Sequence, residues 1–216
     1  MAEITEFIVL HTTKYGENSL VVHSLSREYG RRSFLVRNVG KNKMALFLPL
    51  NVLEAEVSES SKSTLYSIRR ISSRHPLNGI RGNMYKNAMT MFMSEVLYRV
   101  LREGVSEHEI YQWCEREILL LDAMESSFSN FHLYFLLELS MVLGFTPSRS
   151  DIRPFVGEYY PVVEKLMTSS LAESMLVPLS GEDRNEIAGR ILKYIEFHTE
   201  SSVSVNSLKV LRELFV

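Results

Sequence analysis

The sequence has one cysteine, Cys114, among its 216 residues. A single thiol can form neither a disulfide within the chain nor a zinc cluster built from cysteines. Such low cysteine usage fits a reducing, cytoplasmic setting. The six histidines form no HExxH pattern and no Cys/His cluster. We therefore predict no metal site and no cofactor.

The motifs of common enzymes are missing as well. The sequence contains no GxxxxGK[ST] and no GxGxxG, so nucleotide hydrolysis and dinucleotide binding have no support. It also lacks GxSxG, the motif around the nucleophile of many serine hydrolases. Without a catalytic motif, we predict that the protein is not an enzyme.

Long hydrophobic runs are also scarce. The most apolar stretch, FHLYFLLELSMVLGF at 131–145, spans 15 residues and contains Glu138. A membrane-spanning helix needs about 20 residues with few or no charges, so we interpret this stretch as a buried helix. The N-terminal MAEITEF has neither the basic nor the apolar region of a signal peptide. No membrane association is predicted.

Charge is distributed unevenly along the chain. Residues 1–86 contain 13 lysines and arginines against 7 acidic residues, a net charge of +6. Residues 87–216 contain 11 against 19, a net charge of −8. Such asymmetry favours a polyanionic partner for the basic part.

The first 76 residues contain five short segments rich in Val, Ile, Leu, Phe and Tyr, which is typical of strands. These segments are EFIVLHTT at 6–13, SLVVHSLS at 19–26, RRSFLVRNV at 31–39, LPLNVLEAEV at 48–57 and STLYSIRRIS at 63–72. Turn signals separate them, at 15–18, 28–30, 40–42 and in the serine-rich SESSKS at 58–63. This pattern predicts a small antiparallel barrel or sandwich, and an OB-fold and an SH3-like barrel match the strand count equally well.

The periodicity changes after the Pro-Leu-Asn-Gly at 76–79, so we expect residues 77–216 to form an all-helical domain. In 83–103, six apolar residues recur at helical spacing. These are Met84, Ala88, Met91, Phe92, Val96 and Val100. Further helices are expected near 107–124, 129–143, 163–175, 180–198 and 205–215. The sequence SRSDIRPFVGEYYPV at 148–162 is interpreted as a long loop.

Eight cations of the first half are candidate DNA-binding residues. They are Arg31, Arg32, Arg37, Lys41, Lys43, Arg69, Arg70 and Arg74. Lysine and arginine supply the phosphate contacts of single-strand binders, and Tyr15, Tyr29 and Phe47 could add base stacking. Alternatively, cations on edge strands only prevent aggregation between sheets.

The stretch VLHTTKYGENSLVVHSLSREYGRRSFLVRNVGKNK at 9–43 resembles the N-terminal signature of the RecO family of bacterial recombination mediators. The matching residues are Tyr15, Gly16, Glu17, Leu20, Val21, Val22, Leu25, Ser26 and Gly30, followed by Arg37, Lys41 and Lys43. The second half is similar too, in LGFTP at 143–147, YIEFHTE around His198 and NSLKVLRELF at 206–215. The resemblance covers nearly the whole chain, in order.

This resemblance implies an N-terminal five-stranded antiparallel OB-fold barrel over residues 1–76, followed by the helical domain. It implies binding of single- and double-stranded DNA, annealing of complementary strands, and loading of RecA together with RecR and the C-terminal tail of single-stranded DNA-binding protein. A cytoplasmic, nucleoid-associated protein is expected. Only Arg37, Lys41 and Lys43 lie in the family's basic segment. Many RecO-like proteins carry a four-cysteine zinc module where this chain has the cysteine-free stretch 148–162.

Two other classes of function fit the residues. An RNA-binding OB-fold protein would prefer RNA to DNA of the same length and sequence. A protein-interaction module without DNA binding could use the cations to dock an acidic segment of a partner.

Overall fold

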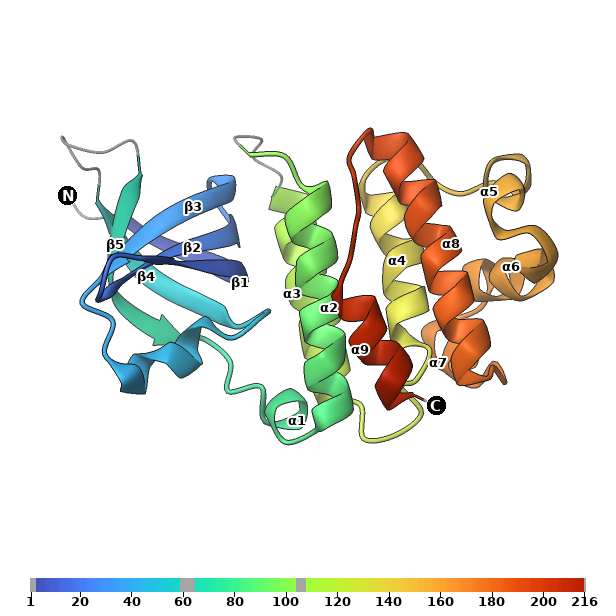
Figure 1. Cartoon of the computed structure of the whole chain (residues 1–216), viewed down its shortest axis with the longest axis horizontal. Helices are drawn as coiled ribbons and strands as arrows, with labels where there is room; N and C mark the ends of the chain where they lie inside the picture. Colours follow the sequence, from blue (N-terminus) through green and yellow to red (C-terminus); the bar gives the residue numbers. More distant parts are fainter. Residues whose placement is uncertain (1–2, 59–64, 104–107, 216) are drawn as a thin grey trace. The chain divides into compact units, whose positions relative to one another are not determined.

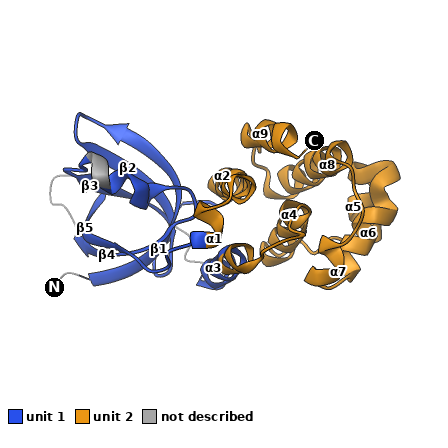
Figure 2. Cartoon of the chain, turned by 90° about the horizontal axis from the view of Figure 1, so that it is seen from below, with its two compact units in different colours: residues 1–78, 101–118 blue, residues 79–100, 119–216 orange. Residues whose placement is uncertain are grey.

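The computed structural model describes residues 3–58, 65–103 and 108–215, except for the side chains of Lys41 and Asn42. The chain divides into two compact units. One comprises Met1–Asn78 and Leu101–Ile118, and the other Gly79–Val100 and Leu119–Val216. Figure 2 shows them in blue and orange. The predicted serine-rich turn at 58–63 lies almost entirely outside the described residues.

Five strands of the first unit close into a barrel with the order β1-β2-β3-β5-β4 (Figure 1). The strands are β1 (Glu3–Tyr15), β2 (Ser19–Ser26), β3 (Gly30–Arg37), β4 (Val52–Ser58) and β5 (Tyr66–Ser73). The long β1 pairs with β2 through its second half and with β4 through its first half. This topology is that of an OB-fold barrel, as predicted.

One pair of neighbouring strands in this mainly antiparallel barrel is parallel. β3 and β5 run parallel, with Phe34 opposite Tyr66 and Val36 opposite Ile68, whereas the other four pairings are antiparallel. A closed ring with an odd number of strands cannot alternate in direction throughout, so at least one neighbouring pair must be parallel. That pair closes the barrel here, and it places the end of β3 beside the first half of β5.

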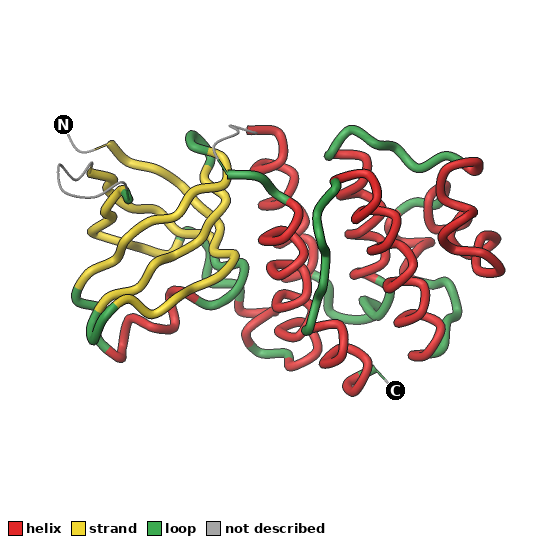
Figure 3. Tube along the Cα trace, turned by 45° about the horizontal axis from the view of Figure 1, so that its top comes forward, coloured by secondary structure: helices red, strands yellow, loops and turns green. Residues whose placement is uncertain are grey.

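The barrel is filled by the inward side chains that its alternating pattern provides. Phe7 and Phe34 are fully buried, with ring centroids 5.5 Å apart. Gly16 and Gly30 adopt positive φ angles of 67° and 61° in the two hairpin turns, where side chains with a Cβ are disfavoured. A 3₁₀ helix, η1 (Lys41–Phe47), connects β3 to β4 (Figure 3). Its last residue, Phe47, joins the barrel core.

The segment 101–118 belongs to the same compact unit as the barrel. Its backbone forms an isolated parallel bridge between Arg31 and Glu103, and it continues into helix α3 (His108–Ala123). On β3, both Phe34 and Leu35 are buried, although alternation places them on opposite faces of the strand. The outer face of β3 is therefore partly covered. The predicted boundary at residue 76, between a barrel domain and a helical domain, stays a prediction.

The described part of the chain after β5 is built from helices, apart from the bridge at Glu103 (Figure 3). Besides α3, the α-helices are α1 (Asn78–Arg81), α2 (Met84–Val100), α4 (Phe131–Val142), α5 (Arg149–Val156), α6 (Tyr160–Thr168), α7 (Leu171–Met175), α8 (Gly181–Thr199) and α9 (Ser207–Leu214). In the apolar face predicted for α2, Met84 and Met91 are in fact exposed. The expected helix at 163–175 is interrupted at Ser170, whose side chain forms a capping box with Glu173 and begins α7.

The interpretation of residues 148–162 as a long loop is wrong. They form α5, the short 3₁₀ helix η2 (Gly157–Tyr159) and the start of α6. Pro154 and Gly157 locally disfavour a helix, but Ile152 and Val156 are fully buried, four residues apart on one face of α5, and Tyr160 of α6 is buried as well. Burial of this apolar stripe outweighs the hydrogen bond lost at Pro154, and Gly157, with a φ of 55°, changes the direction of the chain.

We predict that Gly79→Ala destabilises the helical unit. A Cβ at Gly79 would lie 2.0 Å from the carbonyl oxygen of Asp122, and the carboxylate of Asp122 also accepts a hydrogen bond of 2.7 Å from the backbone N–H of Ile80. Because the backbone would have to move, we expect the free energy of unfolding to fall by about 1–3 kcal/mol, which is typical of overpacking. Urea unfolding measures it. Gly189→Ala, at a site with nothing within 4 Å, is the control, and equal stabilities of the two variants would contradict the prediction.

Candidate nucleic-acid interface

Four of the eight predicted cations line one cavity on the barrel. Arg37 ends β3, Lys43 lies in η1, and Arg69 and Arg70 lie in β5. The parallel register that pairs Val36 with Ile68 brings Arg37 and Arg69 to the same level. We call this space of about 130 Å³ the β3–β5 cavity. Both Arg37 and Lys43 are exposed.

An irregularity in β5 turns two consecutive arginines toward one carboxylate. Arg69 pairs with Glu56 and Ser72 with Glu54, so that two residues of β5 stand opposite Ala55 alone, as in a β-bulge. Arg70 has a positive φ of 52° there. Without the bulge, alternation would place Arg69 and Arg70 on opposite faces. With it, both side chains are exposed, by 65% and 77%.

Glu56 of β4 binds both of these arginines. Its carboxylate lies 3.2 Å from Nε of Arg69 and 2.5 Å from Nη1 of Arg70. The hydrogen bond from Arg70 is the main reason why the pKa of Glu56 is lowered. The carboxylate therefore stays ionised and opposes part of the positive charge of the cavity. Glu56 carries no signal of this role in the sequence, because only the β4–β5 register places it beside these arginines.

Arg32 lies against aromatic rings. Its guanidinium is 4.4 Å from the ring centroid of Tyr66 and 5.9 Å from that of Tyr29, within the range of a cation–π interaction. The two tyrosine rings are themselves 5.8 Å apart. Burial, followed by the hydrogen bond to Glu3, raises the pKa of Tyr29 to about 12. Arg32 thus contributes to packing at the barrel surface, and it is not among the residues that line the cavity.

Arg31 contacts the segment that covers β3. Its Nη1 donates a hydrogen bond of 3.0 Å to the carbonyl oxygen of Leu101. Two residues along, Ser33 donates one of 3.0 Å to the carboxylate of Glu103. Arg31 and Ser33 thus lie on the face of β3 that this segment partly covers, and a DNA-binding role for Arg31 stays a prediction.

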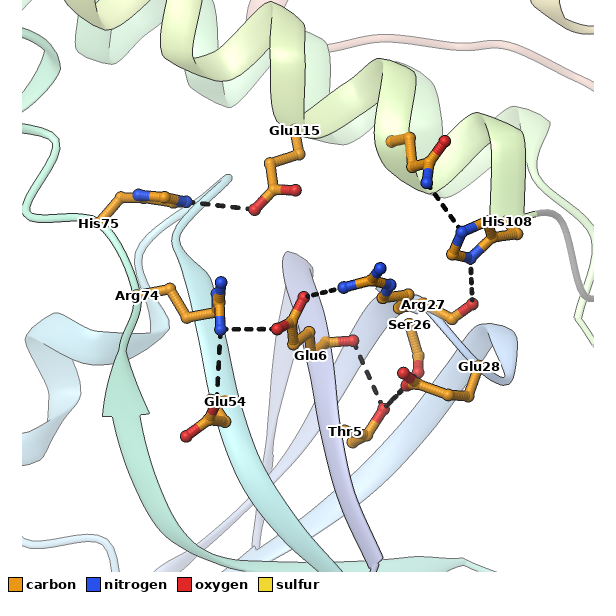
Figure 4. Close-up of polar contacts among 11 residues, drawn as sticks. Thr5, Glu6, Ser26, Arg27, Glu28, Glu54, Arg74, His75, His108 and Glu115 are labelled. Carbon is orange, nitrogen blue, oxygen red and sulfur yellow. Dashed lines mark hydrogen bonds and ion pairs between the residues drawn. The ribbon is translucent and has the colours of Figure 1, made fainter.

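Arg74, the residue after β5, is surrounded by carboxylates (Figure 4). Its Nη1 lies 2.6 Å from Glu6 and 3.4 Å from Glu54. Glu6 also pairs with Arg27 at 3.0 Å. Nearby, His75 contacts Glu115 of α3 at 3.1 Å. Arg74 therefore belongs to an ion-pair network of its own, and the structure does not bring all eight predicted cations together.

The remaining candidates differ in their surroundings. Lys41 begins η1, but its side chain lies outside the described residues. Tyr15 is 58% exposed at the end of β1. Phe47 is only 5% exposed, yet it lines the β3–β5 cavity. Of the three aromatic residues considered for stacking, Phe47 alone lines the cavity, and Tyr29 packs against Tyr66 instead.

The stretch 148–162, where many RecO-like proteins carry a zinc module, does not fit a metal. Its described residues include Asp151 and Glu158 but neither cysteine nor histidine. Nowhere in the described parts of the chain do three or more His, Cys, Asp or Glu side chains gather as metal ligands would. Within the same described residues, no helix is long and apolar enough to span a membrane.

Comparison with known proteins places the chain in a family. The sequence model described as "Recombination protein O N terminal" matches residues 1–77, and that described as "Recombination protein O C terminal" matches residues 81–152. The "DNA repair protein RecO" of Phocaeicola vulgatus is 33% identical over 240 residues, covering the whole of both chains. The chain belongs to the RecO family. The RecO resemblance of the sequence is thereby confirmed.

Other RecO relatives also align along their full length. The "DNA repair protein RecO" of Bacteroides fragilis is 32% identical over 244 residues and is covered completely. That of Flavobacterium psychrophilum is 27% identical over 234 residues, with 98% of both chains covered. The chain is thus a RecO-family DNA repair protein with an OB-fold barrel. The match to the C-terminal RecO model ends at residue 152, inside α5.

Proposed function

We propose that the surface around the β3–β5 cavity binds the phosphate backbone of DNA. The observation that carries this proposal is the convergence of Arg37, Lys43, Arg69 and Arg70, from two strands and η1, on one cavity of an OB-fold barrel. Phosphate contacts by lysine and arginine supply affinity without reading base sequence. Membership of a family of DNA repair proteins supports DNA as the polyanion.

The biochemical role that fits such a surface is annealing. Cations that neutralise two phosphate backbones let complementary strands approach, and pairing then needs no covalent step. We propose that the protein binds single- and double-stranded DNA, anneals strands and helps to load RecA onto DNA coated with single-stranded DNA-binding protein. RecR and the C-terminal tail of that binding protein are the proposed partners, and association with the nucleoid follows from DNA binding.

Fluorescence anisotropy with labelled single-stranded DNA, RNA and duplex DNA, at several salt concentrations, tests this function. We expect both DNA forms to bind and the affinity to fall steeply with salt. Preference for RNA of equal length and sequence would instead support an RNA-binding protein. Absence of binding to every nucleic acid would support a protein-interaction module. Strand annealing, followed with two complementary labelled oligonucleotides, tests the second step.

Replacing Glu56 should strengthen DNA binding. In Glu56→Gln the carboxylate no longer competes with phosphate for Arg69 and Arg70, so one further phosphate can be neutralised. We expect the salt slope of single-strand binding to steepen by about 0.7. An exposed ion pair contributes little to stability, about 0–1 kcal/mol, so the fold should persist. Anisotropy across a salt series measures the slope.

Glu54→Gln is the matched control for that variant. Glu54 lies in the same strand and loses the same charge, but it pairs with Arg74, which does not line the cavity. Equal steepening in the two variants would show that net charge alone acts. An unchanged salt slope in Glu56→Gln would show that Arg69 and Arg70 do not contact the DNA.

A further inference from the structure

We propose that the β3–β5 cavity is a pocket for one unpaired nucleobase, while the cations around it bind the phosphates on either side. The inference rests on the proposed function and assigns a nucleotide, rather than phosphate alone, as the ligand of this site. Charged and apolar side chains line this one cavity together.

The apolar part of the cavity has no use in binding phosphate. Phe47, Ile68 and Val36 of the barrel core form one part of its lining. Val39, Leu46 and Ile71 form another, and these three are only partly buried. A phosphate group would have to be desolvated against this surface at a cost. The flat face of a nucleobase would instead cover these apolar side chains and remove them from water with a gain.

The cations are placed where the phosphates of that nucleotide would be. Arg69 and Arg70 already direct their guanidinium groups at the single carboxylate of Glu56, which stands in for an anionic oxygen of a phosphate. Arg37 and Lys43 line the same space from β3 and η1, and the described residues show no ion pair with either. Cations from both sides of a ring-sized cavity suit the two phosphates that flank a base.

The volume limits the ligand to one ring system. A volume of about 130 Å³ is well below the roughly 300–1,000 Å³ of pockets that enclose a drug-sized ligand, so the cavity suits one ring system and not a base pair. A base can enter only when it is unstacked and unpaired, as in single strands. The pocket would therefore add affinity for single-stranded DNA, whereas duplex DNA would use the cations alone.

Oligonucleotides without bases test the proposal on the unmodified protein. A single strand of thymidines and a strand of the same length built from abasic nucleotides carry the same phosphates. We expect the abasic strand to bind about tenfold more weakly, near the lower end of the 1–3 kcal/mol that one base contributes through ring contacts. Competition anisotropy at fixed salt measures the ratio of the two affinities.

A substitution within the cavity locates the effect. Val39→Met places a longer, flexible and non-aromatic side chain at the wall, which fills the space and offers no ring for stacking. We expect the ratio between the thymidine and abasic strands to fall from about tenfold toward one, while duplex affinity stays unchanged. Val210→Met, at a partly exposed valine of α9, is the matched control and should keep the ratio.

The binding of the thymidine and abasic strands distinguishes three results. Equal binding of both strands by the unmodified protein would overturn it while leaving DNA binding through the cations intact. A ratio that survives in Val39→Met would place the base contacts elsewhere and also overturn it. Absence of binding to either strand would refute the proposed function itself, a result distinct from the other two.

Discussion

A protein with Arg37→Ala and Lys43→Ala is expected to bind single-stranded DNA about tenfold more weakly near 0.15 M salt than the unmodified protein. The slope of log affinity against log salt should become shallower by about 1.4, because each lost phosphate contact contributes about 0.7 for single strands. Both side chains are exposed, so the change in stability should stay within about 0.5 kcal/mol. Anisotropy titrations across a salt series measure both quantities.

Lys193→Ala with Arg212→Ala provides the control for this loss. Both are exposed cations of the helical unit, so the control removes the same charge without touching the cavity. We expect it to keep the affinity and the slope. An equal loss of affinity in both double variants would mean that net charge governs binding. No loss of affinity in either would show that Arg37 and Lys43 do not belong to the interface.

The second large effect concerns the stability of the helical unit in acid. His132 of α4 is 1% exposed, and its ring lies near those of Phe92 and Phe215. Burial, and secondly the positive charge of Arg184, lowers the pKa of His132 to about 3, compared with about 6.5 in the unfolded chain. Below pH 6.5 the unfolded chain binds a proton that the folded protein does not bind. The free energy of unfolding should therefore fall by about 1.4 kcal/mol for each pH unit between 6.5 and 3.

Replacing this histidine should remove that part of the pH dependence. His132→Leu has no group to protonate, so its stability relative to the unmodified protein should rise by about 2–3 kcal/mol between pH 7 and about pH 4.5. Urea unfolding followed by far-ultraviolet circular dichroism at several pH values measures the difference, in which the other titrating groups cancel. His198→Leu, at an exposed histidine of α8, is the control. Parallel pH profiles of the unmodified protein and His132→Leu would contradict the prediction.

Much of the fold could be predicted because local patterns and tertiary packing agree. The hairpin after β1 requires a left-handed residue, and Gly16 supplies it. The start of α8 was readable from Ser180, whose hydroxyl accepts a hydrogen bond from the backbone N–H of Asp183. The error at 148–162 arose where the two disagree. Pro154 locally disfavours a helix, but burial of Ile152 and Val156 stabilises one.

The candidate site was only half predictable. Composition indicated that the barrel carries the cations, and the family resemblance singled out Arg37, Lys41 and Lys43. No local pattern showed that Arg74 would pair with Glu6, which lies at the other end of the barrel sequence. Nor did any pattern show that Arg31 would bind the carbonyl of Leu101, 70 residues away. Such contacts depend on which segments fold against each other.

The order of the amino acids by itself determined the five strands of the first half and the helices of the second, because alternation, helical spacing and turn glycines act over a few residues, and its short motifs indicated the family. Only the tertiary structure decided which cations share a cavity. The parallel pairing of β3 with β5 and the bulge at Arg70 set that grouping, and strand register is a property of the closed barrel rather than of any one strand. For the same reason Glu56, an ordinary strand residue in the sequence, lies between Arg69 and Arg70.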